Sequence, residues 1–278
     1  MEGRYAELRR ILDEIGPCFV AFSGGVDSTF LLRAAHDRLG EGVVAVTAVS
    51  PSLPRAEREE AIALARRIGA RHLLVETHEM EDPAYVRNDA SRCYHCKREL
   101  FGVLRRVAAE AGGRPVIYGA ITDDLGEDRP GMRAAAETSV RAPLIEAGLT
   151  KGMVRALSKS LGLPTWDKPS MACLASRIPR ATPVTAEVLA LVERAEAALK
   201  ALGYRQVRVR YQGPEARVEL DPEGVRRSAS IVNRRRLIAA VRDAGFRRVS
   251  VDPRGYRPGG GISPPPAGGR PEPVPAGS

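Results

Sequence analysis

One stretch near the N-terminus, Ala21-Phe22-Ser23-Gly24-Gly25-Val26-Asp27-Ser28, constrains the fold of this chain more than any other. An apolar run that predicts a strand leads straight into a Ser/Gly/Gly turn, and we expect a helix to begin at Asp27 or Ser28. Gly24 and Gly25 lack a Cβ, so their backbone N–H groups can approach an anion closely. The start of a helix adds unpaired N–H donors and the positive end of its dipole. The stretch therefore predicts a phosphate-binding loop between a strand and a helix.

Hydroxyl groups and a missing lysine indicate which kind of phosphate loop this is. The loop is not of the G-x-x-x-x-G-K-S/T type, because that lysine is absent. The pattern S-G-G-x-D-S resembles the PP-loop of the ATP pyrophosphatases, which split ATP between its α and β phosphates. A plain glycine turn between a strand and a helix is the alternative. The resemblance implies that ATP binds at Ser23, Gly24, Gly25, Asp27, Ser28 and Thr29.

Apolar runs alternate with amphipathic segments through the first 160 or so residues, which is typical of an α/β fold. This alternation predicts a parallel sheet with helices on both faces. Ligands in such folds bind at the carboxyl ends of the strands, where the glycine pair, Ser50 and residues 119–124 fall. We expect strands over 18–22, 43–49, 73–76 and 116–118, and helices over 1–15, 28–39, 55–68, 95–111 and 151–161. Thr150 is the expected N-cap of the last helix.

The pattern changes near Thr182, which predicts a second domain. We expect a PP-loop domain over residues 1–180, a small α+β domain over 181–252 and a disordered tail over 253–278. In the tail, 15 of 26 residues are Pro or Gly. The remaining residues include too few apolar side chains to build a core. The α+β domain is predicted to contain helices over 186–201 and 230–244 and strands over 206–211, 216–220 and 248–251, the first two strands forming a hairpin.

The composition indicates where in the cell we expect the protein and what kind of molecule we expect it to bind. No apolar run is long enough to span a membrane, and the first ten residues are polar, so we expect a cytoplasmic protein. The net charge of +9 suits either nucleic acid or an anionic small substrate. Only five of the 43 basic residues are lysine, a bias more typical of a GC-rich genome, and aromatic residues make up only 5%. We therefore expect an anionic small molecule and no nucleic acid.

Three of the four cysteines are candidates for chemistry. Cys93 and Cys96 form a C-x-x-C pair. Cys173 lies near Lys168 and Arg177 in the sequence, and these cations would favour its thiolate. Cys18, inside the first predicted strand, is expected to be a buried structural thiol. Three thiolates suit a 4Fe–4S cluster with one open iron. The alternatives are a zinc site completed by His95 and a redox-active dithiol.

At this point a specific resemblance emerges. The chain resembles the LarE family, ATP-dependent sulfur transferases that build the nickel-pincer nucleotide cofactor of lactate racemase. The R-C-Y-H-C-K and C-L-A-S-R-I-P segments carry most of the specificity, and the likeness covers about residues 5 to 257. The matching segments are residues 22–28, 92–97, 119–131, 141–151, 166–169 and 173–177.

The resemblance implies a reaction in two steps. A carboxylate of pyridinium-3,5-dicarboxylate mononucleotide is adenylated with release of pyrophosphate, and sulfur then displaces AMP to give a thiocarboxylate, at both carboxylates. In some family members the cysteine at the position of Cys173 gives up its own sulfur and becomes dehydroalanine. Other members hold a cluster on three cysteines. Because Cys93 and Cys96 are both present, we expect the cluster route. The resemblance also implies a homo-oligomer, a hexamer.

Further roles follow from charge and from the resemblance. Asp27 and Asp124 are candidates for holding Mg²⁺, which prefers hard oxygen ligands. Arg208 and Arg210 alternate on one predicted strand, share a face and resemble the family's ligands for the substrate phosphate. Arg177, a candidate catalytic residue together with Cys173 and Asp27, is expected to meet substrate or AMP phosphate. Lys97 shares this expectation, and Glu196 is expected near the substrate.

One departure from the family and three rival functions remain open. The family often ends in a short segment like G-Y-R-S-G-S, whereas here residues 255–257 lead into the long tail, so any role of that terminus in assembly is in doubt. The first rival is a tRNA thiolase of the PP-loop superfamily, which also combines a C-x-x-C pair with a third cysteine. The others are an ATP-dependent amide-forming enzyme of the NAD synthetase type and a non-enzymatic nucleotide sensor.

Overall fold

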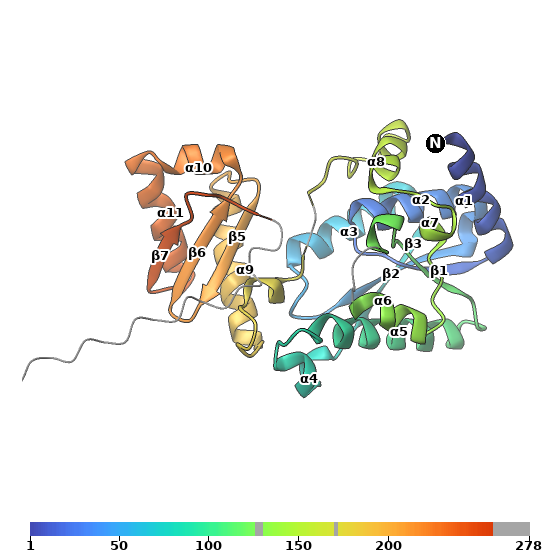
Figure 1. Cartoon of the computed structure of the whole chain (residues 1–278), viewed down its shortest axis with the longest axis horizontal. Helices are drawn as coiled ribbons and strands as arrows, with labels where there is room; N and C mark the ends of the chain where they lie inside the picture. Colours follow the sequence, from blue (N-terminus) through green and yellow to red (C-terminus); the bar gives the residue numbers. More distant parts are fainter. Residues whose placement is uncertain (126–129, 170–171, 258–278) are drawn as a thin grey trace, which may run out of the picture. The chain divides into compact units, whose positions relative to one another are not determined.

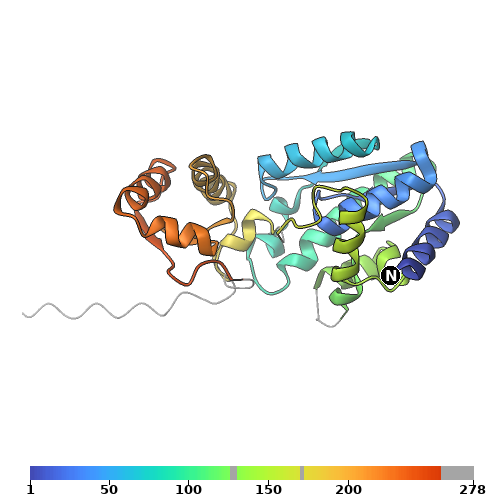
Figure 2. The ribbon, with the colours of Figure 1, turned by 90° about the horizontal axis from the view of Figure 1, so that it is seen from above.

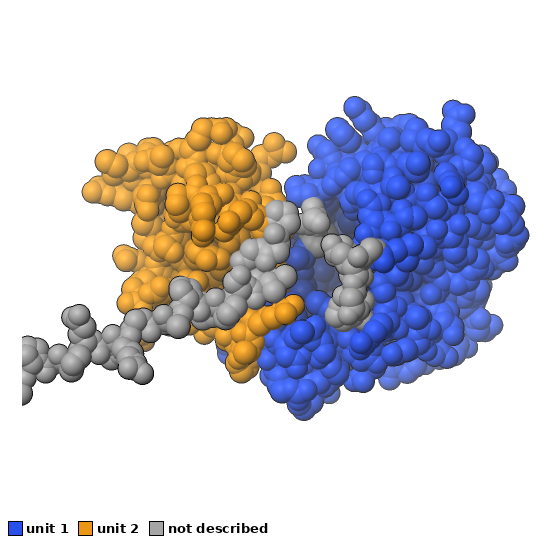
Figure 3. Space-filling view, viewed as in Figure 1, with its two compact units in different colours: residues 1–175, 184–190 blue, residues 176–183, 191–278 orange. Residues whose placement is uncertain are grey.

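The structure is a computed structural model that describes residues 1–125, 130–169 and 172–257. The chain divides into two compact units, coloured separately in Figure 3. Unit 1 comprises Met1–Ala175 and Val184–Ala190, and unit 2 comprises Ser176–Pro183 and Leu191–Ser278. The predicted disordered tail begins at residue 253. Its residues from 258 onward lie outside the described part of the chain.

A four-stranded parallel sheet forms the centre of unit 1, as the α/β pattern predicted. Its strand order is β3-β2-β1-β4. The strands alternate their side chains between two apolar layers: Val20 points into one layer, whereas Phe19 points into the other. Such two-sided burial explains the nearly continuous apolar runs in the sequence. The strands are β1 (Cys18–Ala21), β2 (Val43–Val49), β3 (Arg71–Glu76) and β4 (Val116–Tyr118).

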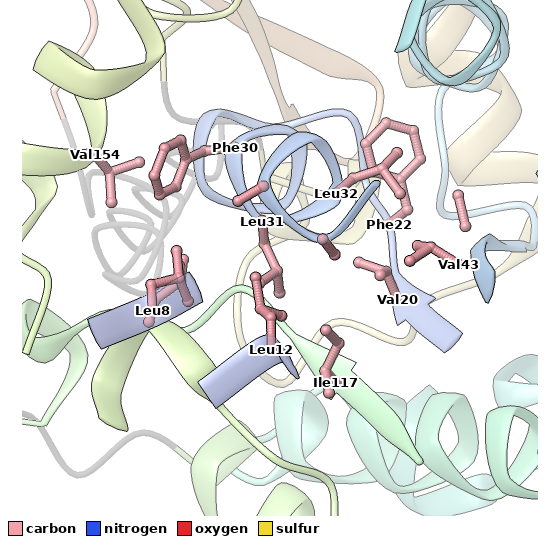
Figure 4. Close-up of a cluster of buried hydrophobic side chains, with 14 of the residues drawn as sticks. Leu8, Leu12, Val20, Phe22, Phe30, Leu31, Leu32, Val43, Ile117 and Val154 are labelled. Carbon is pink, nitrogen blue, oxygen red and sulfur yellow. The ribbon is translucent and has the colours of Figure 1, made fainter. Parts of the chain in front are cut away.

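Helices cover both faces of this sheet (Figures 1 and 2). One face carries α1 (Glu2–Ile15), α2 (Val26–Leu39), α3 (Arg55–Ile68) and α8 (Lys151–Ser160), and Figure 4 shows the core that they share with the strands. The opposite face carries α5 (Arg92–Glu110) and α6 (Pro130–Glu137).

Short elements that the sequence did not predict connect the long ones. They are α4 (Pro83–Val86), α7 (Pro143–Glu146) and the 3-10 turns η1 (Gly40–Gly42), η2 (Glu79–Glu81), η3 (Thr122–Asp124) and η4 (Leu174–Arg177). Both short α-helices begin with proline, whose fixed φ suits a first turn and whose missing N–H is not needed there.

A three-stranded sheet with order β5-β6-β7 forms unit 2. Strands β5 (Val207–Gln212) and β6 (Glu215–Leu220) pair antiparallel, which confirms the predicted hairpin. Strand β7 (Arg248–Val251) pairs parallel to β6 after a crossover through α10 (Pro222–Ser228) and α11 (Ile231–Asp243). Helix α9 (Ala186–Ala201) precedes the sheet, and its residues from Leu191 onward belong to this unit.

Several predicted boundaries shift by a few residues. Helix α2 begins at Val26 because Gly25 is its N-cap, so Asp27 lies within the first turn. Helix α5 begins at Arg92, three residues earlier than predicted, which places the C-x-x-C pair on a helix. Thr150 caps α8 as predicted, since its hydroxyl accepts from the Met153 N–H at 3.3 Å. None of the described helices combines the length and the apolar character that crossing a membrane requires.

Candidate functional site

The glycine loop follows β1 and is held in shape by its own hydroxyl groups. Gly24 has φ +69°, a conformation that favours glycine, and a Cβ there would stand 3.3 Å from the Ala61 backbone. The Ser28 hydroxyl donates to the Gly25 carbonyl at 3.3 Å and accepts from the Ser23 N–H at 3.3 Å. The Ser23 and Ser28 hydroxyls are 3.1 Å apart. The loop is therefore ordered before any ligand binds.

Gly119, which directly follows β4, lies against the start of α2. A Cβ at this position would stand 2.9 Å from the Ser28 nitrogen and 3.0 Å from the Asp27 carbonyl carbon. Real Cβ atoms do not approach a backbone so closely, so only glycine fits here without movement. The sequence places residues 119–124 at the ligand-binding edge of the sheet but does not identify the close contact of Gly119 with α2. The available signal was a glycine at the carboxyl end of a parallel strand.

An ion pair connects the loop to α8. Lys151 Nζ donates to both carboxylate oxygens of Asp27, at 2.9 and 2.6 Å. The Lys151 backbone N–H donates to Asp123 Oδ2 at 2.9 Å. Lys151 is the first residue of α8, immediately after the Thr150 cap. Sequence reasoning missed this lysine, because 124 residues separate it from its partner.

A second lysine also reaches the loop. Lys168 Nζ donates to the Gly24 carbonyl at 3.2 Å and forms ion pairs with Glu57 and Glu60 at 3.2 and 2.8 Å. Arg155 fixes the turn that carries Lys168, since its guanidinium donates to the Trp166 and Lys168 carbonyls at 2.7 and 2.9 Å. Sequence proximity had suggested that Lys168 acts on Cys173, whereas these bonds connect it to the glycine loop.

The remaining predicted nucleotide and magnesium ligands of unit 1 lie at the same sheet edge in different settings. Thr29 is fully buried, and its hydroxyl has no hydrogen-bond partner among the residues that the structure describes. Ser50 donates to Glu79 Oε1 at 2.5 Å, and the buried Glu79 also accepts from Ser52 at 3.0 Å. Asp124 Oδ2 accepts from the Ile121 N–H at 3.0 Å, within its own 3-10 turn.

The candidate thiols lie on two segments that bonds hold in place. Cys93 is exposed and Cys96 half-buried near the start of α5, and Cys173 is half-buried just before η4. The segment after Cys173 is fixed because the Leu174 N–H donates to the Ser52 carbonyl at 2.9 Å. Arg92 Nη1 bonds the Ala175 carbonyl at 2.8 Å and Asn88 Oδ1 at 2.6 Å.

Electrostatics indicate that the three thiols share one neighbourhood. Burial raises the pKa of Cys96 to about 12; Lys97 opposes this shift, and the charges of Cys173, Glu79 and Cys93 add to it. The pKa of Arg92 is raised overall. Burial acts to lower it, but the charges of Cys173 and Cys93 act in the opposite direction. Arg92 therefore lies close enough to Cys93 and Cys173 for their charges to act on its pKa.

Cys18 differs from the other three. It is fully buried within β1, and burial raises its pKa to about 12. A buried thiol that keeps its proton is unreactive. Cys18 is therefore a structural thiol, as its place in the predicted strand indicated.

The metal alternatives can be compared with this geometry. Within the described residues, no three His, Cys, Asp or Glu side chains stand together so as to hold one metal ion. His95, the proposed fourth zinc ligand, has Nδ1 3.2 Å from Asp82 Oδ2. In a 4Fe–4S cluster each thiolate binds a different iron, so its ligands stand further apart than those of a single ion. The thiols come from two segments, and the 4Fe–4S cluster, like the zinc site, stays a prediction.

Unit 2 contains the predicted arginines, each buried beside an acid or an aromatic ring. Arg177 is 3% exposed and pairs with Glu196 through two bonds of 2.8 and 2.9 Å. Glu196 also accepts from the Val209 N–H of β5 at 3.0 Å. Arg210 pairs with Glu219 at 2.9 Å and donates to the Ser176 carbonyl at 2.9 Å.

Arg208 shares the face of Arg210 on β5, as the alternation predicted. Its guanidinium lies 5.2 Å from the centre of the Tyr256 ring, within cation–π range. Burial, followed by the charge of nearby Arg177, lowers the pKa of Arg208. A buried arginine next to a second arginine favours an anion as an additional partner. Lys97, the last predicted phosphate ligand, is exposed on α5 of unit 1.

Comparisons with known proteins can now be added. No known protein-family model matches the chain. An uncharacterised protein of Synechocystis sp. is 44% identical over 259 residues, which span 93% of this chain and 97% of that protein. The pyridinium-3,5-bisthiocarboxylic acid mononucleotide synthase of Lactiplantibacillus plantarum is 36% identical over 255 residues, or 91% and 92% of the two chains.

A more distant match concerns the fold class. A glutamine-hydrolysing GMP synthase of Aeropyrum pernix is 29% identical over 206 residues, which span 65% of this chain and 38% of that protein. This partial match is in keeping with the PP-loop superfamily that the glycine loop predicted. The match to the L. plantarum synthase runs almost from end to end and confirms the resemblance read from the motifs. The chain belongs to the family of the pyridinium-3,5-bisthiocarboxylic acid mononucleotide synthases, the LarE family.

Proposed function

We propose that this protein is an ATP-dependent sulfur transferase acting on pyridinium-3,5-dicarboxylate mononucleotide. It adenylates the carboxylates of this substrate and converts them to thiocarboxylates, the groups in the name of the L. plantarum relative. The observation that carries the proposal is the match to that synthase over 91% of the chain, together with an ordered glycine loop at the carboxyl end of β1.

The first step is adenylation. A substrate carboxylate oxygen attacks the α-phosphorus of ATP, the bond from that phosphorus to the bridging oxygen breaks, and pyrophosphate leaves with the electron pair. Negative charge builds up on the phosphates. In this proposal the N–H groups at Gly24 and Gly25 and the hydroxyls of Ser23, Ser28 and Thr29 stabilise it. Ser50, after β2, is a further nucleotide contact in this proposal.

Magnesium fits the loop because the partly exposed carboxylate of Asp27 lies in the first turn of α2, directly after the glycine pair. In phosphate sites Mg²⁺ is often held by one or two carboxylates, with phosphate oxygens and waters completing its shell. Asp27 is the primary candidate, and both of its oxygens already face a cation. Asp124 is the second candidate, with one oxygen engaged by the Ile121 N–H. When bound, the ion would neutralise charge on the triphosphate.

The second step replaces AMP by sulfur. A sulfur nucleophile attacks the acyl carbon, and the bond from that carbon to the phosphate oxygen breaks as AMP leaves. In the preferred route Cys93, Cys96 and Cys173 would hold a 4Fe–4S cluster, and the cluster would supply a transferable sulfide when bound. Arg92 adds a positive charge in the neighbourhood of these thiols. In the alternative route Cys173 attacks with its own thiolate, and elimination then leaves dehydroalanine.

The substrate phosphate is assigned to the arginines of unit 2. Arg208 and Arg210 are nearly buried on one face of β5, where guanidinium groups can bind phosphate in a bidentate manner. Arg177, held by Glu196, would add a third positive charge or position its neighbours. Lys97 is proposed to meet AMP or substrate phosphate. A cytoplasmic location and a homo-oligomer belong to the same proposal.

The direct test is product analysis under anaerobic conditions. We expect protein incubated with MgATP, the dicarboxylate mononucleotide and a sulfide source to release AMP and pyrophosphate and to form the thiocarboxylate, detected by mass spectrometry. Substrate-dependent exchange of labelled pyrophosphate into ATP would isolate the first step. Absence of exchange with this substrate would overturn the assignment of the carboxylate.

The sulfur source is tested by the composition of the purified protein. Iron and sulfide analysis with an absorption spectrum should reveal the cluster, and Cys93→Ala should remove it. A protein without iron that turns over once per chain, while losing the mass of one H₂S from Cys173, would replace the cluster route by the sacrificial one.

A tRNA thiolase is the second candidate, and the charge of unit 2 favours it. That unit contains 19 basic and nine acidic residues. Binding of tRNA that weakens steeply with salt concentration would support this candidate. Salt-independent or absent tRNA binding, together with product formation from the mononucleotide, would exclude it.

A further inference from the structure

A buried tyrosine hydroxyl in unit 1 lacks a hydrogen-bond partner. Tyr85 lies in α4, and only 1% of the residue is exposed. Its hydroxyl oxygen is buried and bonds no other group among the residues that the structure describes. A buried donor without a partner costs free energy, because the unfolded chain can bond the same group to water. Such a hydroxyl is explained if its partner is a group that changes state during the reaction.

Helix α4, which carries Tyr85, is attached to the start of α5. The N-cap of α4 is Asp82, whose Oδ2 accepts from Arg98 Nη2 at 3.1 Å. The same oxygen lies 3.2 Å from His95 Nδ1. Both partners belong to the first two turns of α5, which also contain the C-x-x-C pair. The ring of Tyr85 is therefore carried by an element that is fixed beside two of the candidate thiols.

The end of α4 is joined to the segment of the third candidate thiol. The Asn88 N–H donates to the Tyr85 carbonyl at 3.1 Å. Arg92 Nη1 donates both to Asn88 Oδ1 at 2.6 Å and to the Ala175 carbonyl at 2.8 Å. Ala175 is two residues after Cys173. These bonds connect Tyr85 to both segments that carry the thiols.

The charges that act on Tyr85 indicate which groups lie near its hydroxyl. Burial raises the pKa of Tyr85, and the charges of Cys173 and then Cys96 act in the same direction. The phenol therefore keeps its proton and remains a neutral donor. Ser52 acts to lower this pKa, but its hydroxyl already donates to Glu79 Oε1 at 3.0 Å. Ser52 is the rival partner of Tyr85, and Cys173 is the thiol with the strongest effect on it.

We propose that Tyr85 is a positioning residue for sulfur transfer, whose hydroxyl donates a hydrogen bond to the Cys173 sulfur when that sulfur is a thiolate. A thiolate accepts such a bond far better than the neutral thiol does. Tyr85 keeps its proton throughout, so neither a proton nor an electron changes place at this residue. The inference deepens the proposed function and rests on it for the use of Cys173, as cluster ligand or as sulfur donor.

Alkylation of Cys173 by iodoacetamide tests the contact. Metal-free wild type and Tyr85→Phe are compared at neutral pH, and mass spectrometry identifies the modified cysteine. Loss of a hydrogen bond to a charged group should lower the thiolate fraction roughly 10- to 100-fold. The more basic thiolate is also more nucleophilic, which offsets about half of this loss on a logarithmic scale. Tyr85→Phe should therefore slow the alkylation of Cys173 by roughly 3- to 10-fold.

Tyr94→Phe is the matched control for the loss of a tyrosine hydroxyl. Tyr94 follows Cys93 directly in α5, but its hydroxyl donates to Glu137 Oε2 at 2.6 Å. This variant should leave the alkylation rate of Cys173 unchanged. Equal slowing by Tyr85→Phe and Tyr94→Phe would overturn the inference, because it would indicate a general rearrangement around α5.

Unfolding in urea distinguishes the proposed bond from a purely structural one. Tyr85→Phe removes a buried hydroxyl without a partner, so the urea midpoint of the metal-free protein should stay the same or rise. If Tyr85 instead donates to Ser52 in the resting protein, the midpoint should fall, as it does when a bonded hydroxyl is lost. A fall in the midpoint would therefore assign the hydroxyl to Ser52 and overturn the inference.

Kinetics of the two steps separate this inference from the proposed function. Exchange of labelled pyrophosphate into ATP should be equal in wild type and Tyr85→Phe, whereas thiocarboxylate formation should slow by roughly 3- to 10-fold. If wild type catalyses neither step, the proposed function fails, while alkylation and unfolding still decide the role of Tyr85. If Cys173 is alkylated equally fast in wild type and Tyr85→Phe, the inference alone is overturned.

Discussion

The two units of this protein carry very different charge. Unit 1 has 25 acidic and 24 basic residues, whereas unit 2 has nine acidic and 19 basic residues, so the net positive charge of the chain resides in unit 2. We propose an anion site in each unit. The site in unit 1 would use backbone N–H groups at a helix start, and the two lysines beside it, Lys151 and Lys168, are paired with carboxylates. The site in unit 2 would use buried guanidinium groups.

This difference between backbone donors and buried side chains determines how each proposed site responds to a substitution. A site made of backbone donors depends on close approach, so an added methyl group can close it. A site made of buried charged side chains depends on partners, so loss of one carboxylate leaves a guanidinium without compensation. The predictions below test that contrast.

The largest effect is expected in unit 2 from Glu196→Gln. This change removes the carboxylate from buried Arg177, and breaking a buried pair on one side costs about 3–5 kcal/mol. Urea unfolding followed by circular dichroism measures the loss. The control is Glu223→Gln, an exposed residue of α10, with an expected change within about 0.5 kcal/mol. Equal stability of the two variants would contradict the contrast.

In unit 1, Gly119→Ala should come next. The new methyl group would meet the backbone of Asp27 and Ser28 at the start of α2, and such overpacking costs about 1–3 kcal/mol. The only tryptophan of the chain, Trp166, lies in unit 1, so its fluorescence reports unfolding there. We expect MgATP affinity to fall while binding of the substrate phosphate by unit 2 persists.

Gly102→Ala is the matched control for this substitution. A Cβ at Gly102 meets no atom within 4 Å, and the residue lies inside α5. Alanine should therefore stabilise unit 1 by about 0.4–1 kcal/mol. Similar destabilisation by both substitutions would mean that the close approach at Gly119 has no special role.

A smaller effect is expected from Thr150→Ala at the start of α8. Loss of the hydroxyl that accepts from the Met153 N–H should cost about 1 kcal/mol. Thr150→Ser preserves the cap and should cost far less. Tryptophan fluorescence during urea unfolding measures both, and equal losses in the two variants would show that the hydroxyl does not act as a cap.

The smallest effect concerns pH and His72. Burial lowers the pKa of His72, which keeps the ring neutral in the folded state. The unfolded chain therefore binds the proton more readily, and stability falls as the pH drops below the ordinary value of about 6.5 towards the lowered one. Comparing urea midpoints at about pH 7.5 and about pH 5.5 should show a smaller loss for His72→Gln than for wild type. An identical loss in both would assign it to other groups.

The sequence predicted the features that depend on local pattern. The apolar strand runs at 18–22 and 43–49, the Thr150 cap and the hairpin of 206–211 with 216–220 all leave short-range signals. The start of α5 was missed because polar residues precede it and no capping side chain marks it. The parallel pairing of β7 with β6 was also missed, since strand order depends on packing and not on local sequence.

The candidate site also contains features that the sequence predicted and features that it did not. The glycine loop was predicted because its geometry requires particular residues at adjacent positions. The pairs of Lys151 with Asp27 and of Arg177 with Glu196 join residues that are 124 and 19 positions apart. Any of many arginines and carboxylates could have formed such pairs. Only the folded chain selects them.

The path of the backbone between the units limits how this protein can be divided or recombined. The chain leaves unit 1 after Ala175, returns at Val184 and leaves again after Ala190. On its return, the Val184 N–H bonds the Val86 carbonyl. No single cut can therefore release either unit as one intact polypeptide. Genetic exchange that imports a new anion-binding unit must carry both junctions together, which favours inheritance of the pair as a whole.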